Sequence, residues 1–111
     1  MNIDVVDVRL DERKLPYLVS ETVAEYRGGY VGEQRLKVNS PEKVVNVLNN
    51  VFHMKDFSEE KLYVMFLSAS LHVIAYAEVG HGVIDSATVG IREIMQRAFL
   101  TNAAGIILAH N

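Results

Sequence analysis

Cysteine is absent from the 111 residues of this chain. Its absence excludes disulfide bonds, thiolate-bound zinc and cysteine nucleophiles, and it is compatible with a reducing compartment. An excess of basic residues is also missing, because 11 Lys and Arg face 14 Asp and Glu and the formal charge is −3. The two signs are mixed along the chain, so the sequence carries no strong nucleic-acid signal.

Long hydrophobic runs are missing as well. The apolar stretches are far shorter than the ~20 residues that a membrane-spanning helix needs. Residues 1–12 have neither a basic lead nor a long apolar run, so we expect no signal peptide. These observations predict a soluble, cytoplasmic protein that does not enter a membrane.

Half of the residues are hydrophobic, which is enough to build the core of one compact unit. Residues 3–10 are rich in Val and Ile and predict a strand. Residues 16–26 carry β-branched and aromatic side chains at intervals and predict a second extended segment. Glycines at 28, 29 and 32 indicate a loop, and residues 34–38 predict a short extended piece.

A helix is predicted from 41 to 52. Ser40 can cap its first turn, Pro41 suits the first helical position, and Glu42 favours the positive end of the helix dipole. Apolar residues then recur at helical spacing. They are Val44, Val45, Val47, Leu48, Val51 and Phe52.

The second half of the chain predicts a β-hairpin at the centre of a sheet, with strands at 62–67 and 72–79 that end before Gly80 and Gly82. Residues 89–102 have the apolar spacing of an amphipathic helix. Residues 105–109 are wholly apolar and predict a buried strand. A helix between two strands is a crossover unit, which allows this last strand to lie parallel to an earlier one. The fold class is therefore α/β or α+β, a mixed sheet with two main helices.

One long motif lies at the end of the sequence. Arg92-Glu93-Ile94 is followed by Ala98, by Asn102-Ala103-Ala104 and then by the run IILAHN at 106–111. This pattern resembles the RadC-like branch of the JAMM/MPN family, whose domains have a cytidine-deaminase-like fold. Upstream, Glu78 lies four residues before Gly82, as the strand-borne glutamate of that family precedes its glycine turn.

The resemblance covers residues 62–111, and residues 39–52 resemble the helix that precedes the domain in this family. It divides the chain into N-terminal strands and a loop at 1–38 and a partial RadC-like JAB/MPN domain at 39–111. We expect the two parts to form one compact unit.

The resemblance implies zinc-dependent hydrolysis of a peptide or isopeptide bond. In the family, zinc is held by both histidines of a His-x-His motif and by a later aspartate, with water in the fourth position. His110 matches the first histidine, and Glu78 matches the general acid/base. The second histidine would follow Asn111, where the sequence ends. We therefore expect at most one of three ligands here and no zinc binding by this chain, whether it is naturally truncated or part of a longer protein.

Interpretations without a functional role also remain open for these residues. His110 can be an ordinary C-terminal histidine, Glu78 a surface carboxylate, and His81 a solvated loop histidine that matches no family ligand. Three functions remain: a RadC-like zinc metallopeptidase domain acting on peptide or protein, a non-catalytic MPN-like interaction module, and a DNA-repair or mobile-element accessory protein. An uncovered sheet edge also predicts a homo-oligomer.

Overall fold

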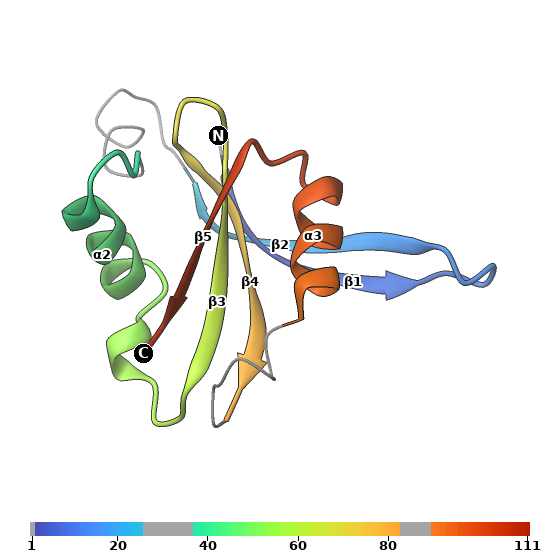
Figure 1. Ribbon diagram of the computed structural model, residues 1–111, viewed down its shortest axis with the longest axis horizontal. Helices are drawn as coiled ribbons and strands as arrows, with labels where there is room; N and C mark the ends of the chain where they lie inside the picture. Colours follow the sequence, from blue (N-terminus) through green and yellow to red (C-terminus); the bar gives the residue numbers. More distant parts are fainter. Residues whose placement is uncertain (1, 26–36, 83–89) are drawn as a thin grey trace.

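The structure, a computed structural model, describes residues 2–25, 37–82 and 90–111. Within these ranges five strands form one mixed sheet in the order β2-β1-β4-β3-β5, and two α-helices pack on it (Figure 1). This arrangement is the predicted α+β class. The elements are β1 (Asn2–Leu10), β2 (Pro16–Glu25), α2 (Pro41–Asn50), the short 3₁₀ helix η1 (Met54–Asp56), β3 (Lys61–Leu67), β4 (Val73–His81), α3 (Ile91–Leu100) and β5 (Gly105–His110).

The predicted central hairpin is β3 and β4, which pair antiparallel inside the sheet. β5 pairs with the other side of β3, also antiparallel. β4, α3 and β5 therefore form a crossover that passes over β3, and β5 runs in the direction of β4 without bonding to it. The prediction allowed a parallel neighbour for β5, but its hydrogen-bonded neighbour is the antiparallel β3. Parallel pairing in the described part of the sheet joins β1 to β4, at Asp4–Ala75 and Val5–Tyr76.

The prediction that β4 ends before Gly80 is wrong, because the strand continues to His81. Gly80 pairs with Leu62, whereas the next residue of β3, Tyr63, pairs with Glu78. Val79 is therefore an extra residue in β4, which is the signature of a β-bulge. Gly82 follows with φ of 84°, a left-handed conformation that glycine adopts without a steric penalty.

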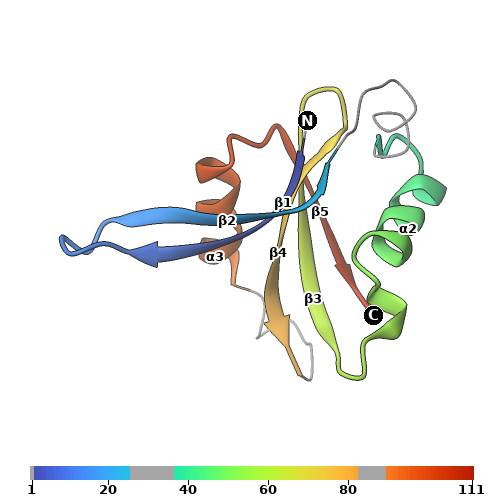
Figure 2. The ribbon, with the colours of Figure 1, turned by 180° about the vertical axis from the view of Figure 1, so that it is seen from behind.

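β1 and β2 form a long antiparallel hairpin that reaches well beyond the rest of the sheet (Figures 1 and 2). The Asp11 carboxylate closes its turn by accepting from the backbone N–H groups of Arg13 and Leu15, at 2.8 and 3.0 Å. Lys14 adopts a φ of 63° within this turn. Leu10, Leu15 and Tyr17 are exposed near the tip, so the hairpin end contributes little to the core.

The predicted capping of α2 is confirmed. Ser40 has an extended backbone, and its hydroxyl accepts from the N–H of Lys43 at 3.3 Å. Pro41 begins the helix and Glu42 lies in its first turn. The helix ends at Asn50, two residues before the predicted end.

α3 ends in a turn that explains the Asn-Ala-Ala part of the motif. Asn102 has φ of 57°, in the left-handed region that asparagine tolerates better than most side chains. The next N–H, of Ala103, donates to the carbonyl of Ala98 at 3.0 Å, as in a Schellman motif. The N–H of Ala104 then donates to the carbonyl of Leu67 at 2.8 Å, and this bond leads the chain into β5 beside β3.

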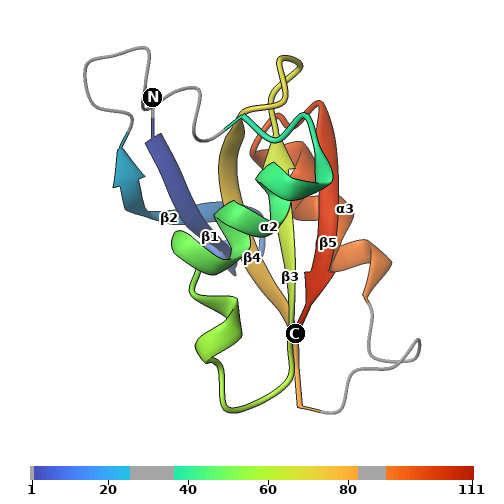
Figure 3. The ribbon, with the colours of Figure 1, turned by 90° about the vertical axis from the view of Figure 1, so that its left-hand side faces the viewer.

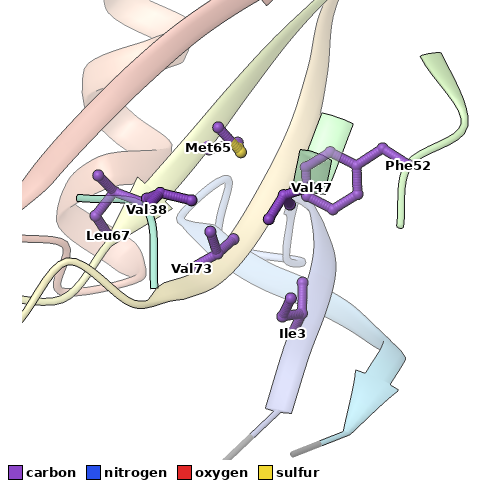
Figure 4. Packing of buried hydrophobic residues seen from close by; sticks show 7 residues of the cluster. All are labelled: Ile3, Val38, Val47, Phe52, Met65, Leu67 and Val73. Atoms are coloured by element: carbon purple, nitrogen blue, oxygen red, sulfur yellow. The ribbon is translucent and has the colours of Figure 1, made fainter. Parts of the chain in front are cut away.

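The two helices lie on opposite faces of the sheet, with α2 in front of the strands and α3 behind them in Figure 3. We call these the α2 face and the α3 face. On the α2 face the core consists of Ile3, Val38, Val47, Phe52, Met65, Leu67 and Val73 (Figure 4). On the α3 face it consists of Val6, Val64, Phe66, Ala75, Ala77, Ile94 and Ala98. Neighbours along β3 thus belong to different cores.

Some predictions lie outside the described residues: the loop at 27–32, the extended piece at 34–36, and the terminal positions 26 and 89 of two predicted elements. In the ranges that the structure covers, no helix is long and apolar enough to span a membrane.

Replacing Asn102 tests the turn after α3. Asn102→Val should lower the free energy of unfolding by about 1–2 kcal/mol, because a β-branched residue is disfavoured at positive φ. Asn102→Gly removes the same carboxamide but adopts this conformation freely, so it should cost little. Urea unfolding of both variants measures the difference. Equal losses for Val and Gly would show that the side chain of Asn102 matters and its backbone conformation does not.

Candidate functional site

The resemblance places its functional residues near one end of the sheet. β3 begins there at Lys61, while β4 ends at His81 and β5 ends at His110. Lys61 pairs with His81 on one side, and Leu62 pairs with His110 on the other. The antiparallel order of the three strands therefore brings the start of one and the ends of two to the same edge.

His110 lies on the α3 face. It pairs with Leu62, and side chains alternate along both strands, so His110 shares its face with Leu108 and with Val64 of the α3-face core. Its side chain is exposed, and its Nδ1 lies 3.1 Å from the backbone oxygen of Asn111.

Glu78 lies on the α2 face. It pairs with Tyr63, which packs against the α2-face core. Its carboxylate forms an ion pair with Lys61, with 3.3 Å between Nζ and Oε1. The Lys61 ammonium also lies 4.7 Å from the centre of the Phe57 ring. Glu78 is thus held among residues of the α2 face.

The structure therefore does not bring Glu78 and His110 together. Tyr63 and Leu62 are consecutive residues of β3, and consecutive side chains of a strand point to opposite faces. Glu78 follows Tyr63 and His110 follows Leu62, so the sheet separates the two. The role given to Glu78 stays a prediction, but the strand register does not support it.

Glu60 immediately precedes β3 and lies two residues before Leu62, the partner of His110. The carbonyl of Glu60 accepts from the N–H of Gly82 at 2.8 Å, which ties this residue to the end of β4. The sequence analysis missed Glu60, because it lies before the apolar run.

Asn111 also lies at this end of the sheet, where it bonds to residues at the start of β3. Its Oδ1 accepts from the N–H of Lys61 at 2.8 Å, and its Nδ2 donates to the carbonyl of Glu59 at 2.9 Å. Nearby, the imidazole of His81 contacts the carboxylate of Glu59 through Nε2. His81 thus has a carboxylate partner, which the sequence analysis did not predict.

The donors here do not fit zinc on their own. A catalytic zinc site needs three protein ligands and keeps a fourth position for water. Across residues 2–25, 37–82 and 90–111, the structure contains no group of three His, Asp or Glu side chains that could hold a metal ion. The match of His110 to a family ligand stays a prediction.

The fold and the terminal motif define a JAB-type α+β domain. Residues 38–111 match the RadC-like JAB domain, and the chain therefore belongs to this family. A UPF0758 protein of Fusobacterium nucleatum is 35% identical over 81 residues, which cover 73% of this chain and 34% of that protein. A UPF0758 protein of Vibrio campbellii is 33% identical over 98 residues, which cover 86% of this chain and 43% of that protein. The chain thus spans less than half the length of these relatives.

A pH profile tests the placement of Glu78 on the α2 face. Burial, and next the Glu78 carboxylate, raise the pKa of Tyr63 above 10.0. Burial, followed by the charges of Tyr63 and Glu21, raises the pKa of Tyr76. A folded-state pKa above the unfolded value means that the stabilisation is complete below pH 10 and is lost as the pH rises through the folded pKa.

The urea concentration at the unfolding midpoint should therefore decrease as the pH rises above 10. Tyr63→Phe should make this decrease smaller. Glu78→Gln should also reduce it, since the carboxylate adds to the shift of Tyr63. Tyr17→Phe, on the exposed hairpin, is the matched control and should leave the profile unchanged. A profile that is the same with and without Glu78 would contradict its position beside Tyr63.

Proposed function

We propose that this chain is the strand-and-helix part of a RadC-like JAB domain whose whole form hydrolyses a peptide or isopeptide bond with zinc. His110 is proposed as one metal ligand. Glu60 is proposed as the carboxylate that takes a proton from the attacking water, in place of Glu78. The observation that supports this assignment is the β3–β5 register, in which His110 pairs with Leu62, two residues after Glu60. The cytoplasmic location stays a prediction.

Zinc binding by the 111 residues is the first test. A single imidazole lacks the full ligand set from which large zinc affinities arise. Titration against a colorimetric zinc chelator should show no stoichiometric tight binding, and His110→Ala should behave as the parent chain does. One equivalent of tightly held zinc that disappears in His110→Ala would contradict this expectation.

Hydrolysis is tested on the protein as its gene encodes it, with peptide and isopeptide-linked substrates and added zinc. Glu60→Gln should lower kcat by about 10²–10⁴-fold, the usual contribution of general acid–base catalysis. Glu78→Gln is the matched control, because this carboxylate lies at the same sheet end on the α2 face, and it should retain activity. A loss in Glu78→Gln with activity kept in Glu60→Gln would return the role to Glu78.

A second candidate function is an interaction module, and a specific surface favours it. Exposed apolar residues line α3 and β5 on the α3 face: Ile91, Met95, Phe99, Ile106 and Leu108. We call them the apolar strip. β5 is also an edge strand, whose outer backbone groups are available for pairing. We propose that this edge and strip join copies of the chain into a homo-oligomer.

Light scattering at high protein concentration tests the homo-oligomer. The parent chain should have the mass of at least a dimer, and Leu108→Lys should shift it toward a monomer, because a charge at the strip must be desolvated on association. Leu10→Lys, at the exposed hairpin tip, is the control and should not change the mass. A monomeric parent chain at all concentrations would refute this proposal.

A further inference from the structure

β2 is an edge strand whose outer side has no strand beside it among the described residues. The sheet order is β2-β1-β4-β3-β5, so β2 bonds to β1 on its inner side alone. The hairpin that it forms with β1 projects beyond the rest of the sheet (Figures 1 and 2). An edge strand presents unpaired N–H and C=O groups that can pair with another extended segment. The outer edge of β2 is therefore a place where a further strand can add.

The turn of the hairpin shows which backbone groups of β2 point outward. The N–H of Asp11 donates to the carbonyl of Leu15 at 3.0 Å, so this pair is hydrogen-bonded. Hydrogen-bonded and non-hydrogen-bonded pairs alternate along an antiparallel ladder. Counting along the register from this pair, Leu18 and Ser20 belong to non-hydrogen-bonded pairs, whereas Val19 belongs to a bonded one. The N–H and C=O groups of Leu18 and Ser20 therefore point away from β1.

An open cavity of about 300 Å³ lies on the same part of the hairpin. It is lined by Val5, Val6, Asp7, Val19, Ser20 and Glu21. The register pairs Val5 with Glu21, so these two side chains share one side of the hairpin, and the pair formed by Asp7 and Val19 follows on that side. Asp7 forms an ion pair with Arg97 at 2.9 Å. The cavity thus combines apolar side chains with the exposed carboxylate of Glu21.

The charge of the hairpin selects the class of partner. Residues 1–25 contain six Asp and Glu against three Lys and Arg, so the formal charge of −3 belongs to this segment and the remaining residues are balanced. A lysine suits the cavity, because its aliphatic stem covers apolar surface while its ammonium stays beside a carboxylate. A second copy fits poorly. Antiparallel pairing of two β2 edges near Ser20 brings their Glu21 carboxylates together, and like charges across strands are unfavourable.

We propose that the outer edge of β2 binds an extended, lysine-containing peptide segment by strand addition. The backbone groups of Leu18 and Ser20 pair with the segment, and one of its lysine side chains lies over Val19 with the ammonium beside Glu21. In this mode of recognition the main-chain bonds supply affinity and the side-chain cavity supplies specificity. The surface is separate from β5 and the apolar strip, and the inference does not depend on hydrolysis by the whole protein.

Hydrogen exchange measured by NMR on the 111-residue chain tests strand addition. The probe is an acetylated octapeptide of alternating threonine and lysine. At saturating peptide, exchange at the Leu18 and Ser20 amides should slow roughly tenfold, the size expected for one gained hydrogen bond. Exchange at the Val19 and Glu21 amides should not change, because the register directs them toward β1. A peptide of alternating threonine and glutamate is the control and should protect neither set.

Two substitutions separate backbone pairing from charge. Ser20→Pro removes an N–H that β1 does not use, so it should abolish peptide binding while the amide shifts of β1 stay those of the folded hairpin. Glu21→Gln should weaken binding about two- to fivefold, the range of a surface ion pair. Glu12→Gln removes the same charge at the hairpin turn and is the matched control, which should bind as the parent chain does.

Unchanged exchange at Leu18 and Ser20 in millimolar lysine peptide would overturn the proposal, and so would equal slowing at every amide of β2. Full binding by Ser20→Pro would exclude pairing through the outer backbone groups. Equal affinity for the lysine and glutamate peptides would exclude selection by charge. Slow exchange at Leu18 and Ser20 that develops without peptide as the protein concentration rises would overturn it in favour of a second copy at this edge.

Discussion

The pairing of β3 with β5 is the constraint on which the candidate site depends. It sets Leu62 opposite His110 and Tyr63 opposite Ala109, and with them the face of each side chain. Because side chains alternate strictly along a strand, a shift of one residue would move His110 to the other face. The register is fixed by burial, since Val64 and Phe66 must face α3 while Met65 and Leu67 face α2. The cores therefore decide which polar residues can meet at the sheet end.

The sequence was sufficient for elements that depend on local chemistry. The Ser40-Pro41-Glu42 start of α2 needs only a capping hydroxyl, a fixed φ and the helix dipole, and all three act within one turn. The strands β1 and β3 followed from their apolar and β-branched runs. The terminal motif also led to the correct family, because its spacing reflects a helix, a left-handed turn and a strand in fixed order.

Long-range pairing could not be read in the same way. Nothing local to β1 indicates that its parallel neighbour is β4, where Asp4 pairs with Ala75, 71 residues later. Nor does anything local indicate that β5 bonds to β3 and not to β4. The bulge at Val79 likewise depends on the pairing of β4 with β3, which the local sequence does not reveal. Gly80 was interpreted as the end of a strand, yet it is a strand residue whose pairing carries β4 to His81. Such features depend on partners that are distant in the sequence.

Because long-range strand pairing could not be predicted from the sequence, the catalytic carboxylate could not be chosen from the sequence either. Glu78 lies within β4 and Glu60 immediately before β3, so both are close to the sheet end that carries His110. The strand register bears on Glu78, which forms an ion pair with Lys61 and pairs with Tyr63 on the α2 face, whereas His110 pairs with Leu62. Since these 111 residues contain no cysteine, a pair of introduced cysteines can measure this placement directly. A short thiol-specific cross-linker should join the Glu60→Cys/His110→Cys pair rapidly and the Glu78→Cys/His110→Cys pair slowly or not at all. The reverse order of rates would contradict the account.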